Sequence, residues 1–197
     1  MDRIDAIWQK TEFDLDKYKE RDFILTGIDK VVVILDESLS EIQDILGSRY
    51  VKRLIVKVQK LADDLLIVSD TIEAWRECQR NWLYLENIFS SKDIRQQRSK
   101  DYQDFDNVNK AWNKIMRKVS NSKKVIKNCN EKQLREFIKY NEQMDRIQKN
   151  LDQFLEEKRT DFPRFYFISS DELLQLLAEQ KVVSSVEKHL NKCFDNV

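Results

Sequence analysis

The chain has 197 residues, of which 36% are charged and 41% are hydrophobic, and its 35 Lys and Arg residues balance 35 Asp and Glu residues. This balance excludes a whole-chain electrostatic attraction to nucleic acid or anionic lipid, so we expect neither nucleic acid nor membrane as a partner. Two glycines and one proline leave few residues suited to β-turns, which favours an all-α fold.

Residues 1–47 are predicted to form N-terminal helices with an interruption. The stretch Phe23–Leu25 is ambiguous between helix and short strand. A helix from Ile28 is expected to end at Gly47, which we assign to the C′ position, where a left-handed backbone is needed.

Residues 48–89 are predicted to form one long helix with an apolar seam. Ten of twelve positions at an unbroken 3-4 spacing are apolar, which indicates a heptad pattern; these positions are Val51, Leu54, Val58, Leu61, Leu65, Val68, Ile72, Trp75, Gln79, Trp82, Glu86 and Phe89. Trp75 and Trp82 lie one heptad apart, so we predict that they pack against a neighbouring helix rather than bind a ligand.

A polar connector is expected from Ser90 to Asp101, and residues 101–159 are expected to form a helical bundle. Its second helix is long and begins near Glu131. We expect this helix to stop just before Pro163, because the residue that precedes a proline is disfavoured in the α conformation.

Residues 160–197 are predicted to form a strand-turn followed by capped helices. Phe162 and Pro163 precede an aromatic run, Phe165–Ile168, with high strand preference. Strand alternation would turn Phe165 and Phe167 toward the helices. A partner strand is then expected, either Phe23–Leu25 or a segment beyond this chain, because unpaired backbone groups are costly when buried.

The next helix carries a start signal of its own. Ser169 and Glu172 have the spacing of a capping box, in which each side chain satisfies a backbone N–H of the other residue. The pattern therefore predicts a helix that begins at this point.

Few residue patterns suggest chemistry. The two glycines stand twenty residues apart and form no phosphate-binding loop. His189 is the only histidine, so a histidine triad or a multi-histidine metal site is not expected. Cys78, Cys129 and Cys193 form no CxxC pair, and we interpret them as buried apolar side chains. No stretch approaches the roughly 20 apolar residues of a membrane span.

The residues alone thus predict an elongated, all-α, multi-helix bundle rod with long amphipathic helices and one short strand or turn near 162–168. Without a recognisable active site, such a rod suits a scaffold, an adaptor or a mechanical part.

Two long strings resemble the dynein heavy chain family in order and spacing. The first runs from Trp75 through Gln79, Trp82 and Phe89 to Ile94 and resembles the pattern W-x-x-x-Q-x-x-W-x-Y-L-E-x-I-F-x-S-x-D-I. The second runs from Leu151 to Leu174 and contains Phe162-Pro163-Arg164-Phe165-Tyr166-Phe167, which resembles F-P-R-F-[YF]-F. The chain departs from the family at Gln97-Arg98-Ser99, where Q-L-P is usual, so a differently shaped connector is expected.

The resemblance implies that residues 1–197 are a fragment of the linker, the arm that lies N-terminal to the first AAA+ module. It implies a non-catalytic segment without a cofactor of its own, since ATP and Mg belong to the AAA+ ring of the parent motor. Trp82 and Ser169 are most similar to axonemal heavy chains, which implies a cytoskeletal location in a cilium or flagellum. Microtubules and dynein intermediate or light chains would be partners of other regions.

The resemblance also implies candidate structural or docking residues: Trp75, Trp82, Phe162, Pro163, Arg164 and Tyr166. The ring of the same heavy chain, or missing linker, would dock where the last two residues lie. The alternative function is a spectrin-like or coiled-coil scaffold without motor activity.

Overall fold

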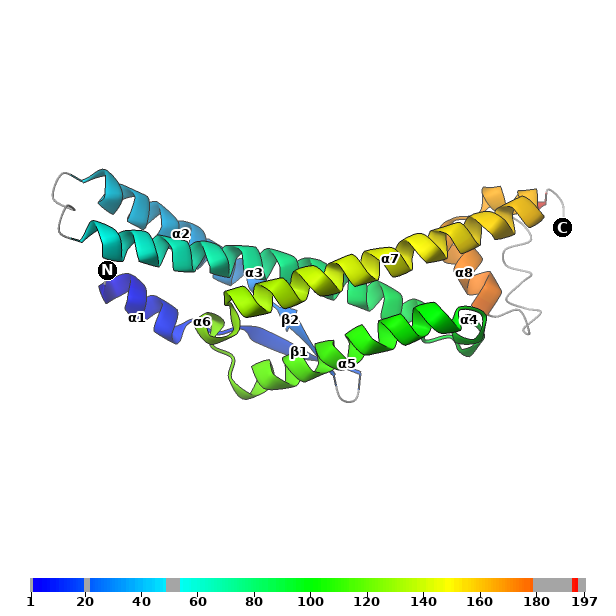
Figure 1. Ribbon diagram of the computed structural model, residues 1–197, viewed down its shortest axis with the longest axis horizontal. Coiled ribbons are helices and arrows are strands. Elements are labelled where there is room, and N and C mark those ends of the chain that lie inside the picture. The colour runs from blue at the N-terminus through cyan, green and yellow to red at the C-terminus, as the bar shows by residue number, and fades with distance from the viewer. Residues whose placement is uncertain (1, 20–21, 49–53, 179–192, 195–197) are drawn as a thin grey trace. The chain divides into compact units, whose positions relative to one another are not determined.

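The computed structural model describes residues 2–19, 22–48, 54–178 and 193–194 (Figure 1). The elements follow in chain order: α1 (Asp2–Lys10), β1 (Asp14–Tyr18), β2 (Asp22–Thr26), α2 (Ile28–Gly47), α3 (Ile55–Ile88), α4 (Lys92–Gln97), α5 (Ser99–Asn121), α6 (Val125–Asn128), α7 (Glu131–Asp161), the 3-10 helix η2 (Pro163–Phe167) and α8 (Ser170–Ala178). The all-α prediction is confirmed, since every described regular element except the β1–β2 pair is helical.

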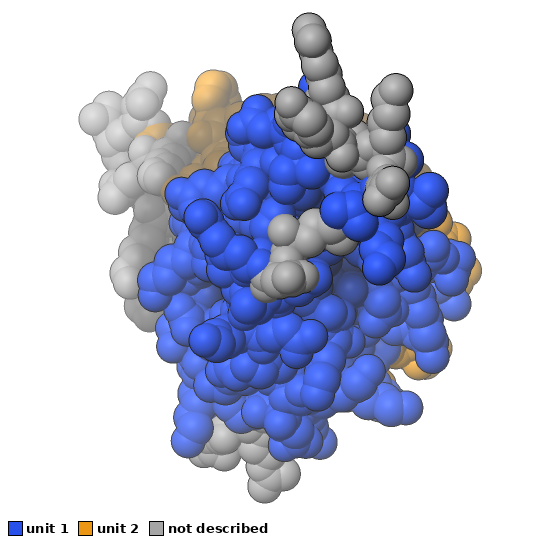
Figure 2. Space-filling view, turned by 90° about the vertical axis from the view of Figure 1, so that its left-hand side faces the viewer, with its two compact units in different colours: residues 1–80, 110–141 blue, residues 81–109, 142–197 orange. Residues whose placement is uncertain are grey.

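The chain forms two compact units. Unit 1 comprises residues 1–80 and 110–141, and unit 2 comprises residues 81–109 and 142–197; Figure 2 shows them in blue and orange. The boundaries fall within α3, α5 and α7. Each unit therefore has a core built from separate stretches of the chain.

The core of unit 1 is centred on Trp75 of α3, which is fully buried. Its ring meets Phe13 edge-on with the ring centroids 5.1 Å apart, and it stacks on Phe137 of α7 at 4.8 Å. Trp112 of α5 lies 6.5 Å from the same Phe137 ring. Aromatic contacts of this kind add to the gain from burying apolar area, and they confirm the core position predicted for Trp75.

An antiparallel hairpin separates α1 from α2. Its register places Leu15 opposite Leu25, so the ambiguous stretch Phe23–Leu25 is a strand. Gly27 then leads into α2 with a left-handed φ of 60°. A Cβ at this position would lie 2.7 Å from a carboxylate oxygen of Asp14. Both the backbone and the available space therefore require glycine here.

The end of α2 differs from the prediction. Gly47 is the last helical residue, and Ser48 after it is extended, with φ −76° and ψ 137°. The Ser48 N–H donates to the Ile45 carbonyl at 3.1 Å. This bond satisfies one of the terminal carbonyls, so the expected left-handed Gly47 is wrong.

The core of unit 2 includes Trp82, which is fully buried. Its indole N–H donates to the Asn109 side-chain oxygen of α5 at 2.9 Å. Phe89, the last seam residue, stacks on Phe105 with the centroids 5.2 Å apart. The core position predicted for Trp82 is therefore confirmed.

The stretch predicted as a polar connector is helical. The Ser91 hydroxyl accepts a hydrogen bond from the Ile94 N–H at 3.5 Å and caps α4. Ile94 is the buried residue of this short helix. Arg98, the C-cap of α4, has a non-helical backbone with φ −119° and ψ 48°, and it separates α4 from α5. The connector prediction was wrong because this short helix has only one capping residue, Ser91, and one buried residue, Ile94. Two such residues among charged side chains do not form a recognisable helical pattern.

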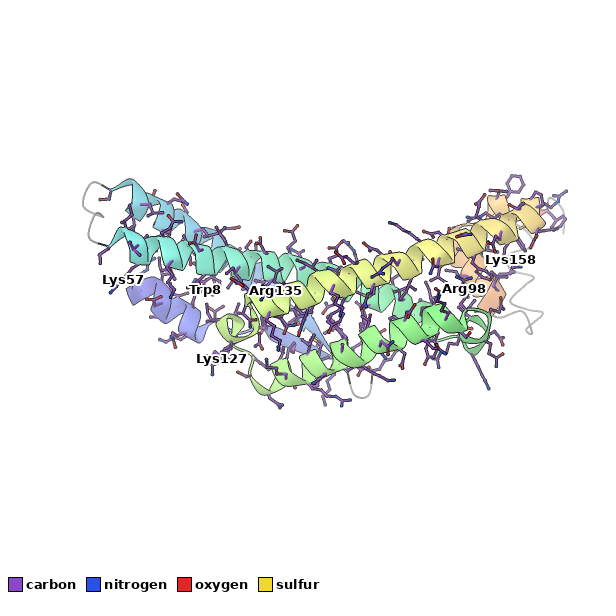
Figure 3. All side chains as sticks on the ribbon, in the orientation of Figure 1. Trp8, Lys57, Arg98, Lys127, Arg135 and Lys158 are labelled. Atoms are coloured by element: carbon purple, nitrogen blue, oxygen red, sulfur yellow. The ribbon has the colours of Figure 1, made fainter. Side chains whose placement is uncertain are left out.

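A buried carboxylate ties the start of α5 to α7. The Asp101 side chain is 5% exposed. One oxygen accepts from Arg98 Nε at 2.7 Å, and the other accepts from the Asn150 amide at 2.8 Å. Figure 3 labels Arg98 at this site. Because the charge is paired and both oxygens are hydrogen-bonded, its burial is tolerated.

The break after α7 forms a 3-10 helix, so the predicted strand is wrong. As predicted, α7 ends before Pro163, at Asp161. The Phe165 N–H donates to the Phe162 carbonyl at 2.9 Å, and the Ile168 N–H donates to the Phe165 carbonyl at 3.3 Å. These bonds satisfy backbone groups that a lone strand would leave unpaired. The expected partner strand is therefore not needed, and β2 pairs with β1 instead.

The 3-10 geometry also changes the facing predicted for two side chains, Phe167 and Ile168, whereas Tyr166 points outward as strand alternation predicted. Ile168 is 3% exposed, whereas Phe167 is 70% exposed.

The capping box predicted at Ser169 and Glu172 is confirmed. The Ser169 N–H donates to the Glu172 carboxylate at 3.2 Å, and the Glu172 N–H donates to the Ser169 hydroxyl at 3.3 Å.

Candidate functional site

Three aromatic side chains stand exposed at the break between α7 and α8. Phe162, Tyr166 and Phe167 have 39%, 56% and 70% of their surfaces exposed, and we call them the aromatic corner. The tight turn of η2 produces this exposure, because only Ile168 at its end turns into the core. A cluster of exposed aromatic residues is typical of a surface that contacts another protein, a membrane or a ligand.

The corner is joined to the C-terminal residues of the chain. Arg164 Nη1 donates to the Cys193 carbonyl at 2.9 Å, and the guanidinium carbon lies 4.4 Å from the Phe194 ring centroid. The Phe162 ring lies 6.4 Å from Phe194 and meets Phe165 edge-on at 4.8 Å. Arg164 therefore acts as a clamp between η2 and Cys193–Phe194, with cation–π and hydrogen-bond contributions.

Charged residues of α7 fix the orientation of Tyr166. Its hydroxyl donates to the Glu156 carboxylate at 2.5 Å, and the Arg159 guanidinium carbon lies 6.0 Å from its ring centroid. The hydrogen bond to Glu156 raises the pKa of the Tyr166 phenol. Arg159 also donates to the Ile168 carbonyl at 3.4 Å and to the Ser170 hydroxyl at 3.2 Å. The corner is thus held by specific polar contacts.

A shallow acidic hollow of about 270 Å³ lies on the last turns of α7. Its lining includes Glu156, which holds Tyr166, together with Gln153, Glu157, Thr160 and Asp161. Lys158 pairs with Asp161 at 3.3 Å. The surface around Tyr166 therefore combines exposed aromatic rings with carboxylates.

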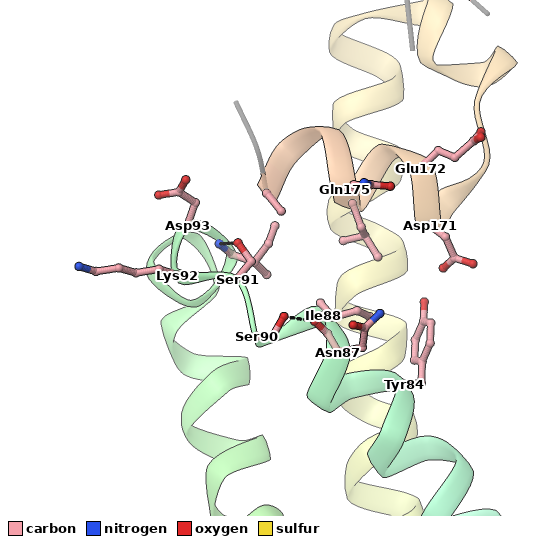
Figure 4. Close-up of a pocket in the computed structure, with 13 residues that line it drawn as sticks. Tyr84, Asn87, Ile88, Ser90, Ser91, Lys92, Asp93, Asp171, Glu172 and Gln175 are labelled. Atoms are coloured by element: carbon pink, nitrogen blue, oxygen red, sulfur yellow. Dashed lines mark hydrogen bonds between the residues drawn. The ribbon is translucent and has the colours of Figure 1, made fainter. Parts of the chain in front are cut away.

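A larger groove of about 840 Å³ lies where the end of α3 meets α4 and α8. Figure 4 shows Tyr84 and Asp171 on one side and Ser91, Lys92 and Asp93 on the other. Burial and the charge of Asp171 raise the pKa of Tyr84. Carboxylates outnumber the one lysine in its lining, so its potential does not favour phosphate.

The described residues contain neither a candidate metal site nor a candidate membrane-spanning helix. Within them, no three His, Cys, Asp or Glu side chains are placed to hold a metal ion. None of the described helices is long and apolar enough to cross a membrane. Cys78 and Cys129 are buried, and burial raises the pKa of both thiols. His189 lies outside the described residues.

The predicted structural or docking residues fall into separate groups. Trp75 lies in the core of unit 1 and Trp82 in that of unit 2. The other residues lie at or beside η2: Phe162, Pro163, Arg164 and Tyr166. Sequence reasoning missed Phe167, which it turned inward, and Glu156 and Arg159, which orient Tyr166. Their spacing from Pro163 carried no signal until the turn of η2 was known.

Comparison with known proteins places the whole chain in one family. The family model described as "Dynein heavy chain, N-terminal region 2" matches residues 1–197. Human dynein axonemal heavy chain 6 is 39% identical over 198 residues, which cover 99% of this chain and 5% of that protein. Rat dynein axonemal heavy chain 1 is 36% identical over 199 residues, or 100% of this chain and 4% of that protein. Human dynein axonemal heavy chain 3 is 35% identical over 199 residues, with 100% and 5% covered. The chain therefore spans only a small part of these curated relatives.

Proposed function

This chain belongs to the dynein heavy chain family, and from that premise we propose that it is a non-catalytic segment of the mechanical linker of a dynein motor. In this role it transmits rearrangements of the AAA+ ring into movement along microtubules. ATP and Mg bind in the ring of the parent motor, and this segment holds no cofactor.

The observation that supports a mechanical role is the length of its helices. α3 has 34 residues and α7 has 31. At 1.5 Å per residue, α3 extends about 50 Å. The seam of α3 is buried at Val58, Leu65, Ile72, Trp75 and Trp82. A long helix packed along its length resists bending, which an arm that carries force requires.

The partners follow from the same proposal. The AAA+ ring of the same heavy chain is the partner of this segment. Microtubules and dynein intermediate or light chains bind other regions of the parent protein. Since the relatives are named axonemal heavy chains, we place the protein in the axoneme of a cilium or flagellum. We do not retain the alternative of a spectrin-like scaffold, because the dynein family model matches the whole chain.

A helix-breaking substitution in the full-length motor tests the mechanical role. Glu73 is an exposed residue within α3. Glu73→Pro removes a helical hydrogen bond and costs about 3 kcal/mol, whereas the control Glu73→Ala keeps the helix. We expect Glu73→Pro to lower microtubule gliding velocity while ATP turnover is retained, and Glu73→Ala to change neither.

Two outcomes would contradict the proposal. One is an unchanged gliding velocity in the Glu73→Pro motor. The other is a proportional loss of velocity and ATP turnover, which would indicate a damaged motor rather than a damaged arm.

The proposal that this segment is non-catalytic is tested on the purified chain itself. Phosphate release from ATP should stay at background, and calorimetry should detect no saturable nucleotide binding.

A further inference from the structure

We propose that the junction of α5 and α6 in unit 1 is a docking surface for an acidic segment of another protein, rich in Asp and Glu. Residues 110–130 contain no Asp or Glu but seven basic residues: Lys110, Lys114, Arg117, Lys118, Lys123, Lys124 and Lys127. The whole chain carries as many acidic as basic residues, so this excess of positive charge is local. The inference goes beyond the mechanical role and does not depend on it.

Most of these positive charges lack a partner of opposite sign. Five of the side chains are exposed, and we call them the basic junction: Lys114, Arg117, Lys118, Lys123 and Lys127. Within the part of the chain that the structure describes, none of the five forms an ion pair, whereas Lys124 pairs with Glu12 at 2.8 Å. The hydrogen bond from Lys124, together with the charges of Lys124 and Lys123, lowers the pKa of Glu12. This carboxylate is therefore already engaged, and the basic junction keeps a positive potential.

Three residues of the basic junction lie on one face of α5. Lys114 precedes Arg117 by three positions and Lys118 by four, so their side chains are neighbours on the helix surface. Like charges at this spacing destabilise a helix. On α7, in contrast, Glu131 and Arg135 are four positions apart and form an ion pair of 3.5 Å. An unfavourable cluster of like charges suits a surface that binds a partner of opposite charge.

The other two lysines lie on a backbone that is fixed by a buried side chain. The Asn128 amide donates to the Ser122 carbonyl at 2.6 Å and to the Lys124 carbonyl at 2.8 Å, and Asn128 itself is 5% exposed. These bonds tie α6 to the connector that follows α5, which fixes the backbone at Lys123 and Lys127. Figure 3 labels Lys127 on α6. A surface on a fixed backbone loses less entropy on binding than a flexible one does.

The composition of the basic junction favours a carboxylate-rich polypeptide over nucleic acid. Surfaces that bind single-stranded nucleic acid use exposed aromatic side chains for stacking, and arginine is the residue suited to bidentate contacts with phosphate. The aromatic residue of this region, Trp112, is fully buried, and four of the five exposed basic residues are lysines.

The burial of the apolar face of α5 argues against a membrane as the partner. An amphipathic helix on a membrane inserts its apolar face into the lipid, but that face of α5 is buried at Val108, Ile115, Met116 and Val119. Ile126 of α6, which is 43% exposed, adds one apolar contact beside the lysines. The expected partner segment is therefore acidic, with an apolar side chain among its carboxylates.

Binding of an acidic peptide to the intact heavy chain tests this inference. The probe is a fluorescently labelled oligoglutamate peptide, and its anisotropy gives the affinity at low and at physiological ionic strength. The test variant is Lys118→Gln/Lys123→Gln, and Lys118→Arg/Lys123→Arg keeps the charge at the same positions. The matched control, Lys57→Gln/Lys60→Gln, removes the same charge at exposed positions of α3 in the same unit.

We expect the original heavy chain to bind oligoglutamate saturably, and more weakly as the salt concentration rises. Lys118→Gln/Lys123→Gln should weaken this binding about three- to tenfold at low salt. The arginine variant and the Lys57→Gln/Lys60→Gln control should bind as the original protein does.

Several outcomes would overturn the inference. The first is the absence of saturable binding to the original heavy chain. Equal weakening in Lys118→Gln/Lys123→Gln and in the Lys57→Gln/Lys60→Gln control would show that only net charge matters. Lost binding in the arginine variant would show that charge is not what the surface offers. Tighter binding of a single-stranded oligonucleotide or of phosphatidylserine vesicles than of oligoglutamate would assign the surface to another class of partner. Neither gliding velocity nor ATP turnover enters the measurement, so its outcome is separate from that of the mechanical proposal.

Discussion

The side chain of Gln79 takes the place of a neighbouring strand beside Leu25. Its amide oxygen accepts the Leu25 N–H at 2.7 Å, and its amide nitrogen donates to the Leu25 carbonyl at 2.9 Å. A primary amide offers the same donor and acceptor as a peptide group. A polar residue in the apolar seam of α3 thus fastens the edge of β2 to the helix.

Replacing this amide should destabilise the protein. Gln79→Leu leaves the Leu25 N–H and carbonyl without these partners, and an unsatisfied buried group costs about 1–3 kcal/mol. The control Gln59→Ala, at an exposed site on the same helix, should stay within about 0.5 kcal/mol of the original free energy of unfolding. Urea unfolding measures the free energy of unfolding of both variants. If Gln79→Leu lowers it no more than Gln59→Ala does, the two hydrogen bonds to Leu25 contribute nothing to stability.

Substitutions at Trp82 separate packing from hydrogen bonding. Trp82→Ala removes a fully buried ring and should cost about 3–5 kcal/mol. Trp82→Phe keeps an aromatic ring but loses the bond to Asn109, and should cost about 1 kcal/mol from that bond. Chemical denaturation gives both values. A loss below 1 kcal/mol for Trp82→Ala would contradict the assignment of this ring to the core.

The features that the sequence predicted well are those set by neighbours along the chain. The seam positions Val58, Leu65 and Ile72 are buried, because a helix of fixed pitch places every third or fourth residue on one face. The capping box of Ser169 and Glu172 is likewise local, since both hydrogen bonds join residues three apart.

The features that were missed depend on contacts between distant residues or on a choice between similar local structures. Nothing near Gln79 in the sequence indicates Leu25, which lies 54 positions away. At Phe165–Ile168, strand preference predicted an extended chain, but Pro163 fixes a φ that also starts a 3-10 turn. The orientation of Tyr166 depends on that turn, so the arrangement of the corner was not readable from strand alternation.

The buried ion pair of unit 2 should contribute more than an exposed one. Arg98→Met leaves the buried Asp101 carboxylate without its cation and should cost about 1–3 kcal/mol. The pair Arg135–Glu131, 3.5 Å apart, is largely exposed, so Arg135→Met should cost no more than about 1 kcal/mol. Both arginines are labelled in Figure 3.

The double variant Arg98→Met/Asp101→Leu completes the comparison. Because it removes both charges, it should recover part of the loss caused by Arg98→Met alone. A coupling energy near zero, measured by urea unfolding of the single and double variants, would show that the pair does not interact in the folded protein.

The capping box at the start of α8 permits a conservative test. Ser169→Ala removes the acceptor for the Glu172 N–H and should cost about 0.5–2 kcal/mol. Ser169→Asp keeps an acceptor at the same position and should retain most of the stability. Equal losses in the two variants, measured by denaturant unfolding, would show that the hydroxyl does not act as a cap.

The contact between Tyr166 and Glu156 makes a prediction at alkaline pH. The carboxylate raises the pKa of the Tyr166 phenol in the folded state, above the usual value of about 10. The folded protein then holds this proton more tightly than the unfolded chain does. The stabilisation is therefore complete below the unfolded pKa and is lost as pH rises through the folded pKa.

Ultraviolet difference titration of tyrosine ionisation, with Tyr166→Phe to identify the contribution of this phenol, measures the shift directly. Glu156→Gln removes the charged acceptor, so we expect the pKa of Tyr166 to fall toward its usual value. Glu157→Gln, which changes the adjacent carboxylate of α7, should leave most of the shift in place. If the Tyr166 signal titrates at the same pH in the original protein and in Glu156→Gln, the hydrogen bond between the two side chains does not hold Tyr166 in its orientation.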